Sequence, residues 1–271
     1  MDDESLGAKQ PESVAAVLKT FGLLQALAER SETGISDLSV RLAMPKATVY
    51  RFLQTMMTLG YVRQGADSER YGLTMKVFEL GTKALQYPEL VDLAKHHMQM
   101  ISDKTGETVH LGALIDSEII YLHKVDSNHA LGMYSKIGRR APLYCTAIGK
   151  VLMAWEHPDR RANILQGAEF KRYRDSTIAN AAEFEQEVAR VLAQGYGEDR
   201  EEFEDHIRCC GVPIFDRLNR PIAGMSVSFP TFRYDPAREQ EVIAMLRNAS
   251  RDISAQLGCT QFPLDQAPQN P

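Results

Sequence analysis

Residues 45–60, PKATVYRFLQTMMTLG, decide how the first third of this 271-residue chain folds. Pro45 suits the first position of a helix, and Gly60 ends the run. Between them, apolar side chains recur at helical spacing: Val49, Phe52, Leu53 and Met56. That spacing predicts a helix that buries one face and turns its polar face to solvent.

The segments on either side of this helix complete a small domain. Before it, residues 14–28 predict a helix with one buried stripe, made of Val14, Val17, Leu18, Phe21, Leu24 and Ala28. A second, short helix is expected in SDLSVRLA, with Ser36 as its N-cap. After it, YVRQ and RYGL flank a polar turn, GADSE, and predict a hairpin. Three helices and a hairpin make a winged helix-turn-helix, over residues 13–74.

Residues 75–88 are expected to form a linker helix. In and just before TMKVFELGTKALQ, apolar side chains recur at helical spacing: Leu73, Val77, Leu80 and Ala84. The segment is too apolar to stand alone in solvent and too short to be a domain, so we predict that it pairs with a second copy of the chain. Pro88 then ends it and marks a domain boundary.

From Glu89 onward the pattern changes to strands and helices. A helix near AKHHMQMISDKTG precedes strands near VHLGALI, EIIYLHKV and LGMYSKIG. Helices follow in TAIGKVLMAW, PDRRANILQ and AEFEQEVARVLAQ, then strands near IRCCGVPIFD and PIAGMSVSFP, and a last helix from Pro236 to about Leu257. This pattern predicts an α+β domain over residues 89–260, with helices on the faces of a central sheet. Only the tail, FPLDQAPQNP, is expected to be disordered.

Composition and charge exclude several classes of protein. No apolar run has membrane-spanning length, and the acidic start MDDESLGAKQPES is unlike a secretory signal, so we expect a cytoplasmic protein without a membrane partner. The four cysteines lack CxxC spacing, which favours free thiols over disulfides or a structural zinc. The net charge is −5, yet residues 13–76 hold eight Lys and Arg against five Asp and Glu. Only this segment has the charge that nucleic acid attracts.

The polar face of the 45–60 helix carries side chains suited to the DNA major groove. They are Lys46, Ala47, Thr48, Tyr50, Arg51 and Gln54, with Pro45 at the start. Arg and Lys donate to guanine, Gln pairs with adenine, and Thr and Tyr bond phosphates. A merely solvated face is the alternative, but the short helix before it and the hairpin after it supply the geometry for docking on double-stranded operator DNA. Arg63 and Arg70 in the hairpin either contact phosphate or minor groove or only keep the ribbon soluble.

Several long motifs occur in an order that resembles the IclR family of bacterial transcription regulators. They are PKATVYRFLQTMMTLGYV, YGLTMKVFELG and IGRRAPLYCTAIGKVLMAW, and the likeness extends from about Ser13 to Leu257. The resemblance implies that a GAF-like α/β effector-binding domain follows the winged helix-turn-helix and the linker helix. Within the family, GYGED, IRC and SFPT are similar to repressors of pectin-degradation genes that respond to 2-keto-3-deoxygluconate.

The resemblance also places an effector site at positions that match the family's binding pocket: Ala147, Ile148, Asp199, Cys209, Ser226 and Ser228. The first two lie at the start of a helix, whose free N–H groups favour an anion such as a keto acid's carboxylate. Ser226 and Ser228 alternate along a strand and therefore point to the same face. Asp199 would accept hydrogen bonds from sugar-acid hydroxyls, and Cys209 would line the wall. Many relatives have Gly where Ala147 stands, and the added methyl restricts how closely a ligand approaches the backbone.

Each of these features also has a structural explanation. The two serines could instead bond neighbouring backbone, and Asp199 stands in an acidic run that is typical of a solvated loop. Cys209 and Cys210 could sense redox state, but adjacent cysteines in a strand more often point to opposite faces as small hydrophobes. Arg139 and Arg140 either steer an anionic effector or form structural ion pairs.

An enzyme would need a nucleophile with a base, a metal site or a cofactor site. The histidines His96, His97, His110 and His123 have no metal-ligand spacing. No GxSxG motif, P-loop or dinucleotide fingerprint occurs, so we expect no cofactor and no catalysis. A metabolic enzyme with a spare N-terminal helical module is the alternative from another class.

These expectations combine into one hypothesis of gene control. A homodimer, pairing further into a homotetramer, would hold two winged helices on the half-sites of a pseudo-palindromic operator. A sugar-acid effector, 2-keto-3-deoxygluconate by the resemblance, would relieve repression by favouring an arrangement that no longer fits both half-sites. The alternative within the same class is an IclR-type regulator, even an activator, that responds to another carboxylic or aromatic acid.

Overall fold

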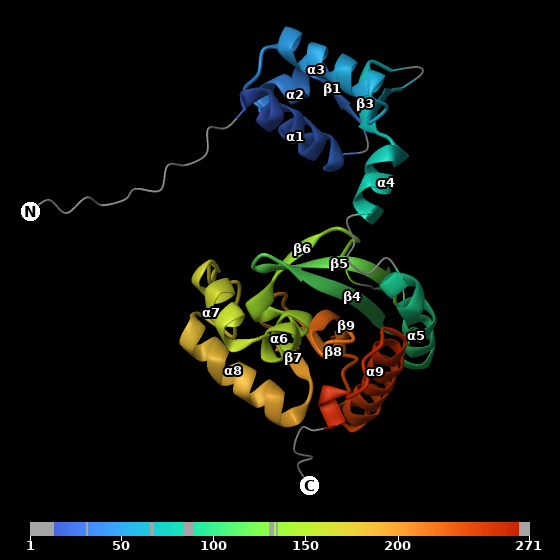
Figure 1. The fold of residues 1–271 in the computed structure, drawn as a ribbon, viewed down its shortest axis with the longest axis vertical. Helices are drawn as coiled ribbons and strands as arrows, with labels where there is room; N and C mark the ends of the chain where they lie inside the picture. The colour runs from blue at the N-terminus through green and yellow to red at the C-terminus, as the bar shows by residue number, and fades with distance from the viewer. Residues whose placement is uncertain are drawn as a thin grey trace, which may run out of the picture. The chain divides into compact units, whose positions relative to one another are not determined.

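The structure of the protein, a computed structural model, describes residues 14–30, 32–65, 68–83, 89–129, 133 and 135–265. The chain divides into two compact units, residues 1–88 and 89–271 (Figure 1). Each unit builds a hydrophobic core of its own, as expected for two domains of ordinary size.

The N-terminal unit is built from helices and a small sheet. Its elements are α1 (Ala15–Ala28), β1 (Thr33–Gly34), α2 (Ile35–Arg41), α3 (Lys46–Thr58), β2 (Val62–Gln64), β3 (Arg70–Leu73) and α4 (Met75–Lys83). Among the described residues, three antiparallel strands pair in the order β1-β3-β2, so that β2 and β3 form the expected hairpin. Residues 66 and 67 of its turn lie outside the described part. Gly60, with φ of +78°, directly follows the last turn of α3 in the left-handed conformation that glycine adopts without strain. The prediction of a winged helix-turn-helix is confirmed.

The core of this unit corrects the predicted burial of α1. Its buried residues are Leu23, Ala26, Leu27, Leu38, Met44, Val49, Leu53, Met56, Val62 and Tyr71. The predicted stripe lies elsewhere on the helix: Val14, Val17, Leu18 and Phe21 are 50–63% exposed, Leu24 is half-buried and Ala28 is exposed. The prediction was wrong because α1 is apolar on two sides. Helical spacing identifies such sides but does not tell which of them meets the core.

Two helices do not begin where the sequence predicted: α2 begins two residues earlier and α3 one residue later. Ser36 lies within the first turn of α2, because the extended Gly34 pairs in β1 and serves as the N-cap itself. Pro45 is the N-cap of α3 instead of its first helical residue. Its carbonyl accepts a hydrogen bond from the N–H of Val49 at 3.0 Å, so proline still opens the helix.

The predicted linker helix is present as α4, directly after the wing. Its side chains Met75, Phe78 and Leu80 are 60–69% exposed, and Val77 is half-buried. Leu73, which was expected to belong to the same helical stripe, ends strand β3 instead. Ala84 and Pro88 lie outside the described residues. Within the N-terminal unit, α4 therefore presents apolar side chains without burying them.

The C-terminal unit is a sheet with helices on both faces. Its elements are α5 (Glu89–Thr105), β4 (Thr108–Ile115), β5 (Glu118–Val125), β6 (Arg140–Pro142), η1 (Leu143–Cys145), α6 (Ala147–Ala154), α7 (Pro158–Gln166), α8 (Ala181–Gln194), β7 (Gly197–Arg200), β8 (Ile207–Phe215), β9 (Pro221–Pro230), α9 (Pro236–Gln256) and η2 (Pro263–Asp265). Across the described residues, the six strands are all antiparallel to their neighbours, in the order β6-β5-β4-β9-β8-β7. The predicted α+β architecture is confirmed.

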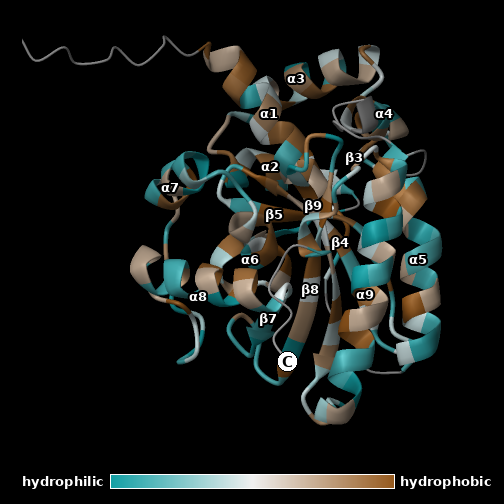
Figure 2. Cartoon of the chain, turned by 60° about the horizontal axis from the view of Figure 1, so that its bottom comes forward, coloured by the Kyte–Doolittle hydropathy of each residue, from teal (hydrophilic) through white to brown (hydrophobic). Residues whose placement is uncertain are grey.

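The helices form two layers around this sheet. Helices α5 and α9 pack on each other and on one face, whereas α6 packs on β8 and β9 from the other face with α8 outside it (Figure 1). Figure 2 shows β8 and β9 largely brown, and brown alternating with teal along α5 and α9, as expected for amphipathic helices on an apolar sheet. Helix α6 is buried at all eight positions, so it lies in the middle of the domain.

Three expectations for this unit need correction. Of the predicted strand LGMYSKIG, residues 131, 132 and 134 lie outside the described part, and the remaining residues form no strand. The edge of the sheet is β6, which pairs with β5. Strand β7 was not predicted, because its sequence GEDR is polar and lacks β-branched residues. In the predicted disordered tail, residues 266–271 are not described, but η2 buries Leu264 completely against Phe215.

Candidate DNA interface and ligand pocket

The polar face of α3 is open to solvent, as predicted. Buried side chains on the opposite face, Val49, Leu53 and Met56, hold the helix against the core. On the open face, Pro45, Lys46, Ala47, Tyr50 and Arg51 are exposed, and Thr48 and Gln54 are half-buried. Lys46 and Arg51 form no ion pair with the residues that the structure describes. Their charges are thus available to phosphates and base edges.

The wing arginines differ in their surroundings. Arg63 on β2 contacts Glu32, with 3.1 Å between Nη1 and Oε1. Arg70, at the start of β3, is exposed. An exposed ion pair is weak, so the contact with Glu32 does not prevent Arg63 from exchanging its partner for a phosphate. The role of both arginines in DNA binding stays a prediction.

A contact that the sequence did not suggest connects α3 to α4. The ammonium group of Lys76 donates to the backbone oxygen of Leu59 at 3.0 Å, just beyond the C-terminus of α3, and lies 5.1 Å from the centre of the Tyr61 ring. Thr74 donates to the oxygen of Gly60 at 2.6 Å. A cation at a helix C-terminus is favourable because the free carbonyls there carry partial negative charge. Helix α4 therefore begins next to the C-terminus of α3, the helix whose polar face is predicted to contact DNA.

A pocket in the C-terminal unit brings together all six residues that were predicted to bind an effector. It encloses about 550 Å³, including its open mouth, between α6 and the sheet. Its lining includes Ala147, Ile148, Asp199, Cys209, Ser226 and Ser228. These residues come from one helix and three strands that are up to 81 positions apart in sequence, so only the fold makes them neighbours.

The N-terminus of α6 forms one wall of the pocket. Thr146 is its N-cap, and its hydroxyl accepts a hydrogen bond from the N–H of Gly149 at 3.1 Å. A Cβ atom added at Gly149 would lie 2.0 Å from the carbonyl oxygen of Leu143, so glycine is needed for the start of α6 to pack against η1. The first turn of α6, with Ala147 and Ile148, is in this way held at the pocket. Its free N–H groups favour an anion.

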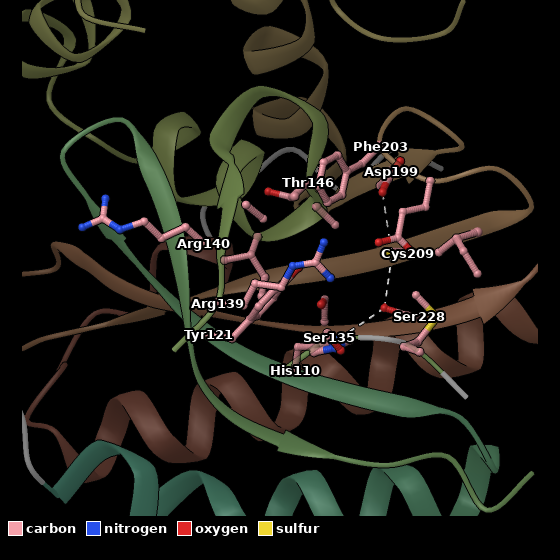
Figure 3. A pocket seen from close by; sticks show the side chains of 17 residues that line it. His110, Tyr121, Ser135, Arg139, Arg140, Thr146, Asp199, Phe203, Cys209 and Ser228 are labelled. Atoms are coloured by element: carbon pink, nitrogen blue, oxygen red, sulfur yellow. Dashed lines mark hydrogen bonds between the residues drawn. The ribbon is translucent and has the colours of Figure 1, made fainter. Parts of the chain in front are cut away.

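The opposite wall carries a chain of polar side chains across the sheet (Figure 3). The imidazole of His110 lies between two hydroxyls, with Nε2 2.6 Å from Ser135 Oγ and Nδ1 3.3 Å from Ser228 Oγ. The thiol of Cys209 is 3.2 Å from Ser228 Oγ and 3.9 Å from Asp199 Oδ2. Hydroxyls, a thiol and a neutral ring can reorient their protons, so this wall can both donate to and accept from a ligand.

The electrostatics of the pocket favour binding over catalysis. Burial, reinforced by Lys124, lowers the pKa of His110 to about 3, so the ring is neutral. Burial also raises the pKa of the Cys209 thiol, and the negative charge of Asp199 adds to this effect. A thiol that stays protonated, in a pocket whose imidazole does not take up a second proton, is a poor nucleophile. The adjacent Cys210 points to the other face of the sheet, 3.5 Å from Glu239 of α9, as expected for alternating strand residues.

The two arginines before Pro142 have different environments. Arg140 also lines the pocket, but its guanidinium forms an ion pair with Glu118 at 3.0 Å and lies apart from the other labelled side chains in Figure 3. Arg139 extends into the pocket in the same view. Of the two open explanations, a structural ion pair fits Arg140 and a position near an anionic ligand fits Arg139.

Several lining residues were missed by sequence reasoning. They are His110, Tyr121, Met133, Ser135, Ala141, Thr146, Phe203, Glu204 and Ile207, whereas for Arg139 and Arg140 the sequence left two explanations open. His110 had been set aside as one of several scattered histidines. The register that pairs His110 with Ser226 across β4 and β9 is the information that would have revealed it.

Behind the pocket, the buried Lys150 of α6 supports the turn that follows β7. Its ammonium donates to the backbone oxygen of Glu198 at 2.7 Å and lies 2.5 Å from a carboxylate oxygen of Glu202 and 3.2 Å from one of Glu187. The N–H of Glu202 in turn donates to Asp199 Oδ1 at 2.8 Å. The acidic run is therefore no solvated loop, because Glu198, Asp199 and Glu202 are buried and Glu201 is partly exposed.

A winged helix-turn-helix joined to a domain with an anion-suited pocket defines a ligand-responsive transcription regulator. The chain belongs to the IclR family: residues 16–66 match the IclR helix-turn-helix domain, and residues 82–255 match the C-terminal domain of bacterial transcriptional regulators of the IclR type. It is 54% identical over 255 residues to the HTH-type transcriptional regulator KdgR of Escherichia coli, covering 94% of this chain and 97% of that protein. It is 52% identical to KdgR of Dickeya chrysanthemi, covering 94% and 84%. The crystal structure of the Thermotoga maritima IclR superposes with a TM-score of 0.75 at 30% identity, covering 89% of this chain and 98% of that one.

These relatives are transcription regulators, so the chain is a DNA-binding transcription regulator and the enzyme alternative is rejected. The described residues contain no helix that is long and apolar enough to cross a membrane. In the same part of the chain, no three His, Cys, Asp or Glu side chains cluster in a way that could hold a metal ion.

Proposed function

We propose that this protein represses genes of pectin and sugar-acid catabolism and that 2-keto-3-deoxygluconate, or a similar keto or sugar acid, releases it from its operator. The observation that carries this proposal is the convergence of the six predicted effector residues on one pocket at the N-terminus of α6. The pocket offers N–H groups for a carboxylate and hydroxyls for a polyol chain. The identity with two KdgR proteins supports the choice of pathway. The protein would act in the cytoplasm, where the chromosome is.

DNA recognition would use the open face of α3 in the major groove. Lys46 and Arg51 would donate to guanine or phosphate, and Tyr50 would bond a phosphate oxygen. Thr48 and Gln54 are half-buried, so they would contact DNA only at the closest approach of the helix. The exposed Arg70 and the weakly paired Arg63 would bind phosphates beside the groove.

Self-association would place two such helices on one operator. Helix α4 exposes Met75, Phe78 and Leu80, and α1 exposes the stripe that had been expected inside. Apolar side chains gathered in this way mark a protein-protein contact more often than a solvated surface. A homodimer, with further pairing into a tetramer, would bury them and match the two-fold symmetry of a pseudo-palindromic operator.

Release by the effector requires different affinities for two arrangements of the protein. A ligand that bound both arrangements equally would shift nothing. The pocket lies between α6 and the sheet, so a ligand there contacts both elements at once. The effector would favour the arrangement in which the two copies of α3 no longer fit both half-sites of the operator.

The test is a gel-shift titration of the full-length protein on DNA from upstream of pectin and sugar-acid catabolism genes, at one stated salt concentration, with and without 2-keto-3-deoxygluconate. We expect a specific complex that the effector dissociates. Arg51→Ala is expected to weaken specific binding about 5- to 150-fold. This range corresponds to the loss of one bidentate base contact, which contributes about 1–3 kcal/mol.

The matched control is Arg30→Ala. It removes an exposed arginine that pairs with Asp37 and does not belong to the polar face of α3. It is expected to leave operator binding within about twofold, since exposed ion pairs contribute little. Calorimetry should give unchanged effector affinity for both variants. If the wild-type complex ignores 2-keto-3-deoxygluconate but dissociates with an aromatic acid such as 4-hydroxybenzoate, the choice of effector is wrong.

A further inference from the structure

The carboxyl group of Asp199 is buried in the pocket without a cation of its own. Asp199 is 4% exposed, and among the described residues it forms no ion pair. Its Oδ1 accepts one hydrogen bond, from the N–H of Glu202 at 2.8 Å. Among the described residues, its Oδ2 contacts only the thiol of Cys209, a weak donor, at 3.9 Å (Figure 3). A buried carboxylate with so little support is costly to keep charged.

The surrounding charged and titratable groups include two cations, Arg139 and Lys150, but among the described residues neither forms an ion pair with Asp199. The groups around Asp199 are Glu202 and Glu204 after β7, Cys209 on β8, His110 on β4, Tyr121 on β5, Arg139 before β6, Cys145 in η1 and Lys150 on α6. The ammonium of Lys150 is already shared by the carboxylates of Glu202 and Glu187. Glu198 and Arg200, the neighbours of Asp199 on β7, belong to the network around Glu187 and Arg190.

The N–H groups that favour an anion lie in the same pocket as this carboxyl group. The first turn of α6, at Ala147 and Ile148, and Asp199 line one space. A ligand carboxylate bound to the N–H groups of that turn would therefore lie beside Asp199, whose own side chain is buried. Two negative charges that share a desolvated site cannot both persist, and one of them takes up a proton.

We infer that Asp199 is a specificity-determining residue in its neutral form: each effector anion enters together with one proton from solvent, and the Asp199 carboxylic acid donates a hydrogen bond to an oxygen of the effector. This inference rests on the proposed function of the pocket as the effector site. It selects ligands that combine a carboxylate with an adjacent acceptor oxygen, as 2-keto acids do. It also reverses the expected role of Asp199, which had been expected to accept hydrogen bonds from effector hydroxyls.

The protonation of the empty pocket supports this inference. Burial raises the pKa of Asp199 to about 7, and the charges of Glu202 and Glu204 add to the rise, whereas the Glu202 N–H and Lys150 oppose it. An anion at the α6 N-terminus would raise this pKa further. Above pH 7 the empty site is ionised and the filled site is neutral, so binding takes up a proton and weakens as pH rises.

Isothermal titration calorimetry of the full-length protein with 2-keto-3-deoxygluconate tests the inference. Titrations at pH 8 in buffers of different ionisation enthalpy give the number of protons taken up per ligand. We expect about one proton, and an affinity that falls toward tenfold per pH unit above pH 7. Asp199→Asn keeps the shape and a donor but carries no charge, so it should bind without proton uptake and with an affinity independent of pH.

The matched control is Asp216→Asn. Asp216 is also buried, but it already has a cation partner, Arg220 at 2.7 Å, on the β8–β9 turn. This variant should keep the proton uptake of the wild type. Wild-type binding without proton uptake at pH 8 would overturn the inference, and so would uptake that survives in Asp199→Asn.

A measurement without ligand separates this inference from the choice of effector. If 2-keto-3-deoxygluconate gives no heat, the choice of effector is wrong. Urea unfolding of the wild type and of Asp199→Asn between pH 4 and pH 9 then still shows whether Asp199 holds a proton in the folded protein. The pKa of Asp199 is raised on folding, so the wild type should lose stability relative to the variant as pH rises from about 4 to about 7. The ratio of their unfolding constants should change up to tenfold per pH unit in that window and then level off. A constant ratio would refute a proton held by Asp199.

Discussion

The buried Lys150 holds in place the turn after β7, the strand that carries Asp199 into the ligand pocket. Its ammonium is fully buried and is shared by Glu187, Glu202 and the backbone of Glu198. Burial would raise the pKa of Glu187, but hydrogen bonds from Arg190 and the nearby Lys150 lower it to about 2. The Glu187 carboxylate is thus ionised at neutral pH and needs its cations.

Lys150→Met should therefore destabilise the C-terminal unit by about 3–5 kcal/mol, because it leaves buried carboxylates without their partner. Urea unfolding monitored by circular dichroism measures this loss. The control is Lys95→Met, which removes the lysine of an exposed pair with Asp92 and should cost less than about 1 kcal/mol. Equal effects of the two substitutions would mean that the network around Lys150 contributes no more to the free energy of unfolding than an exposed ion pair does.

Residues of the pocket were predictable to different degrees. The six effector positions came from resemblance to a family, and the structure brings them together. His110 and Ser135 were missed because their closeness, 2.6 Å between Nε2 and Oγ, arises from strand register and a loop. No local pattern of residues carries that information.

At the scale of elements, helix α6 depends on one glycine, whereas α4 does not. A Cβ atom at Gly149 would lie 2.0 Å from the Leu143 oxygen, in backbone that cannot rotate away. A Cβ atom at Gly81 in α4 would meet nothing within 4 Å. The same substitution should have opposite effects at these two positions.

Gly149→Ala should destabilise the protein by about 3 kcal/mol or more, because η1 and α6 must separate, and it should weaken effector binding at the α6 N-terminus. Gly81→Ala should stabilise α4 by up to about 1 kcal/mol, because alanine is the better helix former. Thermal unfolding of both variants, with calorimetric effector titration of the folded protein, provides the comparison. Gly149→Ala with unchanged stability and affinity would contradict the close packing of η1 on α6.

At the scale of the whole molecule, the exposed apolar side chains of the N-terminal unit need a partner. The stripe on α1 includes Leu18 and Phe21, which are 61% and 60% exposed. Burying such a side chain gains about 1.5–3 kcal/mol. We propose that association of two chains covers this stripe together with the apolar side chains of α4.

The double variant Leu18→Ser/Phe21→Ser should shift the protein toward monomers, by at least about tenfold in the dimer dissociation constant. Analytical ultracentrifugation measures this shift, and operator affinity should fall with it while effector affinity is retained. The control is Val40→Ser on α2, which removes a side chain that is 81% exposed outside the stripe. A double variant that stays dimeric would place the contact between copies elsewhere.

The sequence by itself determined the features that are encoded locally. The spacing of Val49, Leu53 and Met56 specified the buried face of α3 and so the open one, because a helix repeats every 3.6 residues whatever surrounds it. The wing and most strands of the C-terminal unit followed from short patterns and turns.

Tertiary structure alone decided which of two apolar sides of α1 is buried, since both have helical spacing. It also decided that the polar GEDR becomes edge strand β7 and carries Asp199 into the interior. Pairing with Cys209 on the next strand and support from Lys150, which is 49 positions away, make that burial possible. Burial depends on contacts between remote segments, whereas periodicity depends only on neighbours along the chain.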